Sequence, residues 1–502
     1  MRRLATVLLS LLMLSLVSCL GGSGDQSADT SAPSRVVMAV TADPDGLDPH
    51  MSAAASTFQV TSSIYETLVT VDAQGHIIPG LAESWQVADD GLSITFTLAE
   101  GVLFSNGEPC DAEAVKASFD RLRSSESVRS GDYAFISGVE VLDGRTVRFT
   151  FDSVNVLALA SFAYPWAAVV DVASSGSLRT NPVGSGPFML SSWVPQQSLV
   201  LTRNPNWRGE CPIEEVEFRL MGDMTSQVAA LQSGQVDIIL ITGDLVGQFE
   251  GRDGYTIDAA AGNGLQLMAM NTARPGLDDV RVRQAINHAV DKDALIEAVW
   301  WGYGEKIGSH FPTVLSEYVD MNGKYPYDPQ RARTLLAEAG YGEGNLKLTM
   351  YLPRSYQEYV NAGQVIAAQL EAVGIDIDIQ IVEWATWLSD IYTGRNYDLT
   401  VVGHTGRLDA YSLLSRYRST ASENYFNYSN GEMDSLLDAY VDEVDVQERT
   451  AIAHRMQQIL AEDVPALYIQ DPIQIYVLDS SLQGFEVFPI NIFKFQNMSF
   501  VE

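Results

Sequence analysis

The apolar positions of this 502-residue chain follow two different periods. In residues 279–290, Val282, Ala285, Ile286 and Ala289 recur at helical spacing and make one apolar face. Residues 375–382 instead alternate strictly between apolar and polar side chains, which predicts a strand with one wet face. Similar patterns predict strands at 265–270, 346–352, 399–402 and 467–475, and helices at 328–340, 359–373 and 451–462. The second half of the chain is therefore predicted to be α/β.

Residues 270–304 combine a chain breaker with two helix starts. Pro275-Gly276 favours a turn, Asp278 or Asp279 is placed to cap a first helix, and Asp291 a second. A strand, a breaker and a new helical layer fit a crossing between two large lobes. They fit an ordinary strand-to-helix connection within one domain equally well, and the spacing alone leaves both interpretations open.

The first half has shorter elements and more turns. A strand is predicted at 36–40, a helix from Phe58 to Val69, a helix at 111–122, and a hairpin around Asp143-Gly144. This antiparallel, helix-flanked block is expected to form its own subdomain.

Length and charge restrict the classes of function. A chain of 502 residues predicts two or three domains. The 31 basic and 64 acidic residues give a formal net charge of −33, which repels nucleic acid phosphates. The six histidines form no metal-binding motif and no nucleophile elbow is present. Gly184 and Gly186 lack the lysine of a phosphate loop. The sequence therefore gives no positive sign of an enzyme, a metal site or a cofactor.

The N-terminus has the features of an export signal. Arg2 and Arg3 precede an apolar run at 4–17, and Leu16-Val17-Ser18-Cys19 resembles a bacterial lipobox. This predicts a signal peptide at 1–18, a lipid attached to Cys19, and a flexible tether at 19–35. The protein is then expected in the periplasm or at the cell surface, anchored to a membrane; a plain signal peptide with a chance cysteine is the alternative. Pairing of Cys110 with Cys211 stays open, although Cys110 is expected to fill an apolar niche.

Several motifs occur in a familiar order. They include IYETLV at 64–69, PGLAESW at 79–85, GVLFSNGEP at 101–109, NPVGSGPF at 181–188, NPNW at 204–207, VRVRQAI at 280–286 and NYSN at 427–430. Together these resemble the extracytoplasmic solute-binding proteins of family 5, which serve oligopeptide, dipeptide and nickel ABC importers. The matches extend from about Ala42 to Phe500.

The resemblance implies an α/β, two-lobed periplasmic-binding-protein (Venus-flytrap) fold. Lobe I would use residues 36–270 with an extra subdomain at about 60–178, lobe II residues 271–470, and residues 471–502 would return to lobe I. Two crossings, near Met270 and Gln470, would form the hinge. The implied function is non-catalytic: a monomer without cofactors captures a small solute, by family frequency a short peptide, and delivers it to the membrane permease subunits of an ABC importer.

The resemblance also suggests where the ligand lies. Residues 403–411 align with the loop that closes over the ligand, which in peptide binders resembles Gly-Trp-Thr-Gly-Asp. Here His404 replaces the Trp and Arg407 falls at the Asp that pairs with the peptide amine, unless Asp409 serves instead. An arginine at this place repels an ammonium group and suits a carboxylate or phosphate. The candidate ligand-binding residues are Phe58, Trp384, Trp387, His404, Arg407, Asp409 and Tyr411.

Other solutes and classes stay open. A chelated metal such as nickel, a sugar or another organic solute are alternatives within the family, although Ala167-Ala168-Val169 stands near the place of one arginine of nickel binders. Two alternatives from other functional classes also stay open, a surface lipoprotein enzyme and a sensor, because both would carry the same export signal.

Overall fold

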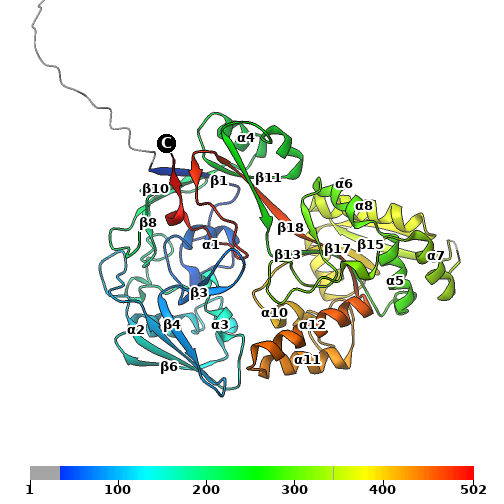
Figure 1. The fold of residues 1–502 in the computed structure, drawn as a ribbon, viewed down its shortest axis with the longest axis horizontal. Coiled ribbons are helices and arrows are strands. Elements are labelled where there is room, and N and C mark those ends of the chain that lie inside the picture. Colours follow the sequence, from blue (N-terminus) through cyan, green and yellow to red (C-terminus); the bar gives the residue numbers. More distant parts are fainter. Residues whose placement is uncertain (1–33, 343, 502) are drawn as a thin grey trace, which may run out of the picture.

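Two lobes lie side by side in the computed structural model, which describes residues 34–342 and 344–501 (Figure 1). The core of the first lobe joins residues from both ends of the chain, among them Val36 and Met498. The predicted signal peptide, the lipidated Cys19 and most of the tether lie outside the described residues. The two-lobed α/β fold with an extra subdomain is confirmed.

The first lobe is built on the larger part of a twelve-stranded sheet, in the order β18-β11-β1-β10-β9-β8, with β12 also paired to β18. Its strands and helices are β1 (Arg35–Val40), α1 (Ala55–Thr61), β8 (Phe188–Val194), β9 (Ser198–Arg203), β10 (Glu215–Leu220), α4 (Met224–Gln232), β11 (Ile238–Ile241), β12 (Tyr255–Ala261), and the tail strands β19 (Leu482–Gln483) and β20 (Ser499–Phe500). Helix α1 is shorter than predicted. It ends at Thr61 because Ile64 and Tyr65, next along the chain, turn into the core.

The predicted subdomain is a four-stranded antiparallel sheet in the order β4-β5-β7-β6, covered by α2. Its elements, with the small hairpin before them, are β2 (Val69–Val71), β3 (Ile77–Pro79), β4 (Ala82–Val87), β5 (Ser93–Leu98), α2 (Ala112–Leu122), β6 (Ile136–Asp143), β7 (Thr146–Phe151) and α3 (Ala158–Ser161). Alternate residues of β5 and β7 are buried. Phe119 of α2 packs edge to face against Phe149 of β7, which packs in the same way against Phe96 of β5.

The second lobe continues the sheet in the order β16-β15-β17-β13-β18. Its elements are β13 (Gly264–Met270), α5 (Val280–Ala289), α6 (Lys292–Trp300), β14 (Gly304–Lys306), α7 (Pro329–Glu338), β15 (Leu346–Pro353), α8 (Gln357–Glu371), β16 (Ile375–Val382), α9 (Trp384–Thr386), β17 (Leu399–Thr405), α10 (Ala410–Leu414), α11 (Gly431–Asp442) and α12 (Val446–Asp463). The predicted caps Asp279 and Asp291 are confirmed, since their carboxylates accept backbone N–H groups at the starts of α5 and α6. The Asp328 carboxylate does the same at the start of α7.

Two adjacent chain segments cross between the lobes. Strand β18 (Ala466–Asp479) pairs with β13 through its first half and with β12 through its second half, always antiparallel. The other crossing is therefore Gly262–Asn263, between β12 and β13, which lies before the predicted Met270. The reason for the difference is that β13 pairs with β17 and packs into the second lobe. The second crossing, at Asp471–Pro472, lies beside the predicted Gln470.

The crossing in β18 holds a buried carboxylate. Asp471 accepts backbone N–H groups from Gly264 at 2.9 Å and Thr313 at 3.1 Å. Burial raises the pKa of Asp471 to about 7. These bonds tie the beginning of β13 to β18, so the two crossing segments are fixed to each other on the second-lobe side.

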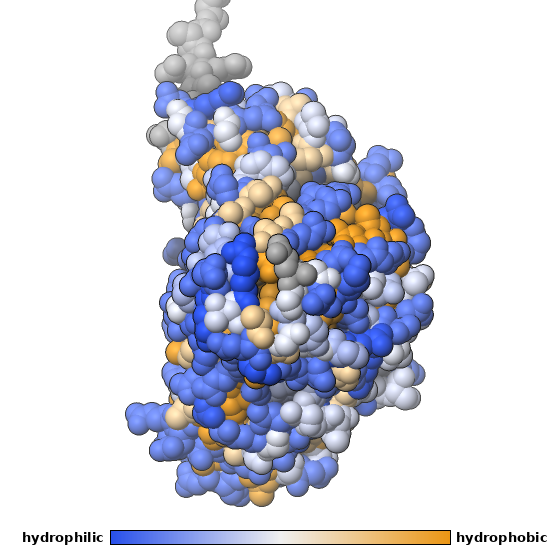
Figure 2. Space-filling view, turned by 90° about the vertical axis from the view of Figure 1, so that its right-hand side faces the viewer, coloured by the Kyte–Doolittle hydropathy of each residue, from blue (hydrophilic) through white to orange (hydrophobic). Residues whose placement is uncertain are grey.

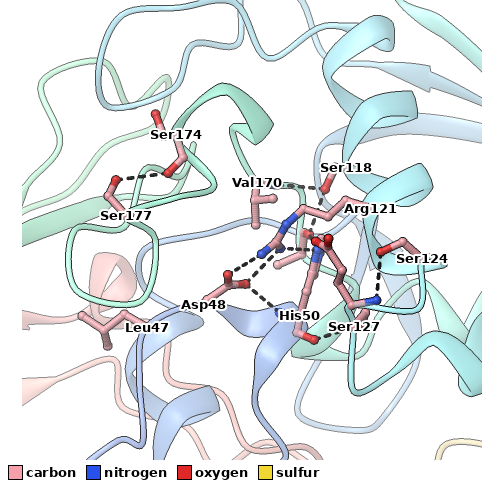
Figure 3. Close-up of polar contacts among 12 residues, drawn as sticks. Leu47, Asp48, His50, Ser118, Arg121, Ser124, Ser127, Val170, Ser174 and Ser177 are labelled. Atoms are coloured by element: carbon pink, nitrogen blue, oxygen red, sulfur yellow. Dashed lines mark hydrogen bonds and ion pairs between the residues drawn. The ribbon is translucent and has the colours of Figure 1, made fainter.

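A buried polar cluster in the first lobe holds the loop after β1 (Figure 3). Arg121 of α2 donates to Asp48 and approaches His50 Nδ1 at 2.9 Å, while His50 Nε2 lies 3.0 Å from the carbonyl of Ala168. Because a carbonyl only accepts, Nε2 carries the proton and Nδ1 accepts from Arg121. Burial lowers the pKa of His50 to about 4. Both ring nitrogens are occupied by the scaffold, which gives this cluster a structural role.

The surface agrees with the acidic composition. Figure 2 views the molecule toward the second lobe and shows a largely hydrophilic face with hydrophobic residues confined to patches. No helix among the described residues has both the length and the apolarity needed to cross a bilayer.

Candidate functional site

A cavity of about 80 Å³ lies between the lobes, against the crossing segments. Its walls come from both lobes, from the crossing at Gly262–Asn263 and from the C-terminal tail. The lining residues are Phe58, Tyr164, Pro165, Trp166, Gly262, Asn263, Thr405, Gly406, Arg407, Gln474 and residues 488–491. This volume is below the roughly 300–1,000 Å³ of typical small-molecule sites. A larger solute therefore needs additional room between the lobes.

The first-lobe wall is an aromatic ledge made of Phe58, Tyr164 and Trp166. The rings of Tyr164 and Trp166 stack with centroids 4.5 Å apart, and Phe58 packs on Trp166 at 5.4 Å. The guanidinium of Arg129 lies 4.3 Å from the centre of the Trp166 ring, a cation–π contact. The ledge is thus held in place by its own packing, with Phe58 only 2% exposed.

Asn263 joins three parts of the molecule at the crossing. Its side-chain amide donates to the carbonyls of Arg407 at 3.2 Å and Pro489 at 2.8 Å, and its backbone carbonyl accepts from the N–H of Gly406 at 2.7 Å. Its φ of 54° is left-handed, a conformation that asparagine tolerates better than most residues. A Cβ at Gly406 would lie 2.0 Å from Asn263 atoms, so this position requires glycine.

The predicted ligand loop contributes to the cavity through Arg407, while two of its neighbours serve the second-lobe scaffold. Asp409 caps α10 by accepting from the backbone N–H and the hydroxyl of Ser412, both at 2.7 Å. Burial raises the pKa of the Asp409 carboxyl. Tyr411 is half-buried in α10 and does not line the cavity. The backbone N–H of Leu408 donates to the Tyr164 hydroxyl at 3.0 Å, which links this loop directly to the aromatic ledge.

His404 belongs to a chain of polar rings inside the second lobe. Its Nε2 lies 3.1 Å from the Tyr425 hydroxyl and its Nδ1 lies 3.4 Å from His310 Nε2. His310 in turn lies 2.9 Å from the Tyr417 hydroxyl. Burial, with the nearby positive charge of Arg416, lowers the pKa of both imidazoles well below 6.5. Both rings are therefore neutral at neutral pH.

The two candidate tryptophans stack on each other with centroids 4.9 Å apart. Trp387 is 2% exposed and its indole N–H donates to Thr400 at 2.9 Å, so it is a core residue of the second lobe. Trp384 is half-buried and packs edge-on against Tyr356. Of the pair, Trp384 is the one with an accessible face.

Sequence reasoning missed four residues of this region: Tyr164, Trp166, Asn263 and His310. A signal was present for three of them. Two aromatic residues flank a proline in Tyr164-Pro165-Trp166, and Gly262-Asn263-Gly264 is a run of turn-forming residues between two apolar strands. Nothing local to His310 marks it, because its partner His404 is distant in the sequence.

The described part of the chain contains no group of three or more His, Cys, Asp or Glu side chains arranged to hold a metal ion. Cys110 and Cys211 are separate, buried thiols. The niche predicted for Cys110 is confirmed, since its side chain lies in the core of the first lobe.

Comparisons with known proteins agree with this geometry. The model of the bacterial extracellular solute-binding proteins, family 5 middle region, matches residues 76–425. Heme-binding protein A of Haemophilus influenzae is 27% identical, with 94% of this chain and 93% of that protein covered. The dipeptide-binding protein of Escherichia coli is 26% identical over 91% of this chain and 92% of that protein.

Among solved structures, HbpA2 from Haemophilus parasuis is 25% identical, covers 93% of this chain and all of that chain, and superposes with a TM-score of 0.85. DppA from Helicobacter pylori, in complex with the peptide STSA, is 25% identical with a TM-score of 0.75, and 93% of this chain and 98% of that chain are covered. This chain therefore belongs to the bacterial extracellular solute-binding proteins of family 5, a family of substrate-binding components of ABC importers rather than of enzymes.

Proposed function

We propose that this protein captures a short peptide or peptide-like solute between its lobes and delivers it to the permease subunits of an ABC importer. The observation that carries this proposal is the interlobe cavity, whose walls come from both lobes at the place where two adjacent segments join them. Relatives named for binding dipeptides, and one solved with the peptide STSA, support a peptide over other solutes.

Capture follows from the arrangement of the walls. The aromatic ledge belongs to the first lobe and Arg407 to the second, so a solute that touches both favours the closed state. Asn263 sits at the junction and bonds to Arg407 of one lobe and Pro489 of the other. A change of backbone angles at Gly262–Asn263 and at Asp471–Pro472 then separates the lobes while each stays rigid.

The positive charges of Arg407 in the cavity and of Arg416 beside the polar chain favour a ligand with a carboxylate. Neither Arg407 nor Arg416 forms an ion pair with a carboxylate of residues 34–342 or 344–501. Arg416 acts through space on His310 and His404, which places its positive charge beside that polar chain. A peptide C-terminus or an acidic side chain supplies the missing partner through charge-assisted hydrogen bonds.

The candidate residues then take different roles. Phe58 packs against apolar parts of the solute, Arg407 binds its carboxylate, and Trp384, His404 and Tyr411 line the second-lobe side of the opened cleft. Asp409 and Trp387, whose polar atoms bond to Ser412 and Thr400, hold that side in shape.

Binding to a peptide panel tests the proposal. Di- to pentapeptides, each with a free or an amidated C-terminus, are added to the purified protein and the melting temperature is measured. At least one free peptide should raise it, and its amidated form should do so less. Arg407→Ala should reduce the shift, whereas Arg252→Ala, an exposed arginine before β12, should not. If no peptide acts, native mass spectrometry of protein purified from cells identifies a chelated metal, a sugar or another solute instead.

We also infer that the mature protein is a monomer held at a membrane by lipid on Cys19. Labelling of cells with a radioactive fatty acid should mark the protein, and Cys19→Ala should abolish the label and release the protein into the soluble fraction. Uptake of the identified solute in a deletion strain separates transport from sensing, since a sensor leaves uptake unchanged.

A further inference from the structure

The subdomain of the first lobe contacts the second lobe away from the crossing segments, in the lower part of the view in Figure 1. Leu157, directly before α3, packs against the buried cluster of the second lobe that includes Tyr440 of α11. Ala158 and Phe162, in the same segment, belong to the core of the first lobe. This short segment therefore contacts the cores of both lobes, and Leu157 is the residue that reaches the second.

A turn of the subdomain makes another contact with the second lobe. A Cβ atom at Gly91, between β4 and β5, would lie 2.8 Å from a methyl carbon of Val154 and 3.3 Å from a methyl carbon of Val444. Val154 belongs to the subdomain, whereas Val444 lies between α11 and α12. Gly91 also has a left-handed φ of 67°, so glycine is required here for both conformation and space. Leu157, Gly91, Val154 and Val444 together are termed the rim contact.

The rim contact is apolar. In the part of the chain that the structure describes, no ion pair joins one lobe to the other. The sequence neighbours of the contact are acidic on both sides, since Asp90 precedes Gly91 and Asp445 follows Val444. Because like charges repel, the attraction between the lobes at the rim comes from the burial of apolar surface.

The rim contact exists only while the lobes are together. Leu157 and Val444 belong to different lobes, and each lobe moves as a unit about the crossing segments. Separation of the lobes therefore exposes both side chains to water. Val444 is 49% exposed even in the contact, so opening loses only part of the free energy of a full side-chain burial. The rim contact is thus weak enough to open and close repeatedly.

We propose that the rim contact holds the two lobes together whatever the chemistry of the solute, and that Leu157 and Val444 are positioning residues for its capture. Neither side chain lines the interlobe cavity. They act by raising the population of the closed state, in which the aromatic ledge and Arg407 line one cavity. The effect on solute affinity rests on the proposed function, whereas the effect on closure does not.

Small-angle X-ray scattering of the purified full-length protein tests the effect on closure. A double variant with Leu157→Ala and Val444→Ser, the rim variant, removes most of the apolar contact. Its ratio of open to closed molecules should be about tenfold higher than in the wild-type protein, and its radius of gyration larger. The matched control variant carries Leu159→Ala and Val446→Ser. Leu159 packs on the first-lobe core and Val446 is 63% exposed, so this variant should keep the radius of the wild-type protein.

Binding kinetics test the effect on capture, with a peptide that raises the melting temperature of the wild-type protein. The rim variant should release this peptide about tenfold faster, while the association rate stays within about twofold, because the rim contact forms after the solute has entered. A conservative double variant with Leu157→Met and Val444→Ile should restore slow release. The control variant should release the peptide at the wild-type rate, although it should melt at a lower temperature than the rim variant because Leu159→Ala removes core packing.

A rim variant with the radius of gyration of the wild-type protein, or a control variant that expands equally, overturns the proposal. Unchanged release of the peptide from the rim variant also overturns it. If no peptide binds, the proposed function fails on its own, and the scattering result still decides whether the rim contact holds the lobes together.

Discussion

The two walls of the interlobe cavity are built on different physical principles. The first-lobe wall is an aromatic ledge fixed by stacking between Phe58, Tyr164 and Trp166, with no carboxylate or imidazole in its surface. Behind the second-lobe wall runs a polar chain through His404 and His310, and Arg407 lies at its edge. The first wall keeps its shape through ring packing and the cation–π contact of Arg129, whereas the second depends on whether its imidazoles are protonated.

Truncation of the ledge should have the largest effect. Phe58→Ala removes a side chain that is 2% exposed and leaves a hole beneath Trp166. The free energy of unfolding should fall by about 3–5 kcal/mol, the usual cost of Phe→Ala in a core. Urea unfolding measures this, with Met51→Ala, 40% exposed in the same lobe, as the control. A loss below about 1 kcal/mol would show that the ledge is not a packed unit.

A lower pH should have the second-largest effect, because it destabilises the protein through the two histidines behind the second-lobe wall. His310 and His404 have folded-state pKa values well below 6.5, so as the pH falls through 6.5 the unfolded state takes up protons first. Stability is then lost as the pH falls below 6.5, by at most about 2 kcal/mol for each imidazole at pH 5.

Urea unfolding between pH 5 and 7.5 gives the dependence of the free energy of unfolding on pH. The double variant with His310→Gln and His404→Gln should flatten most of it. The part that remains combines His50 of the first lobe, whose pKa is lowered to about 4, with Asp471, whose pKa is raised to about 7 and whose contribution to stability has the opposite sign because it is lost as the pH rises. If the double variant keeps the pH dependence of the wild-type protein, the loss of stability at low pH does not come from His310 and His404.

Arg407→Ala should separate binding from stability. Within residues 34–342 and 344–501, the one hydrogen bond that the Arg407 side chain donates is the contact at 3.5 Å with the carbonyl of Gly406, so the free energy of unfolding should change by less than about 0.5 kcal/mol. Affinity for a responding peptide should fall about 10- to 100-fold, as expected for a lost charge-assisted hydrogen bond. Calorimetric titration measures it, with Arg407→Lys retaining part of the affinity. Unaltered binding together with a large loss of stability would mean that the loop is a scaffold element.

Tyr164→Phe should have the smallest effect. It removes the hydroxyl that accepts the N–H of Leu408 across the cleft but keeps the ring stacked on Trp166. Loss of one neutral hydrogen bond is worth about 0.5–1.5 kcal/mol, and water replaces it when the lobes open. Ligand affinity should therefore fall by about 2- to 10-fold with little change in the melting temperature of the free protein. An effect larger than that of Arg407→Ala would reverse the roles assigned to the two walls.

Features that depend on neighbouring residues could be predicted from the sequence, but contacts between residues that are distant in the sequence could not. The helix starts at Asp279, Asp291 and Asp328 follow from caps that act within one turn, and strand β16 follows from strict alternation. The first crossing was placed at Met270 because a turn signal follows it, while the break at Gly262–Asn263 interrupts an apolar run without ending it. Resemblance to a family supplied the two lobes and the loop of Arg407.

The polar chain behind the second wall needed the fold itself. His310 and His404 come from separate segments and meet because β17 lies beside the loop after β14. Asp409 is a different case, because its two bonds to Ser412 form a helix cap within one turn, a role that local sequence reasoning can predict.

The passage of β18 from one lobe into the other also orders the events of biogenesis. Residues 264–472 build the second lobe without interruption, but the sheet of the first lobe lacks a strand until residues 473–479 arrive, and its core lacks Phe493 and Phe495 until the chain ends. A chain that emerges N-terminus first across a membrane can therefore complete its second lobe while the first still has an open sheet edge. Contacts as distant in sequence as the hydrogen bond between Ser62 and Phe493 form late and slowly. The first lobe is thus synthesised first but completes its folding last. Premature termination near the C-terminus should therefore destabilise the first lobe, although most of its residues have already been synthesised.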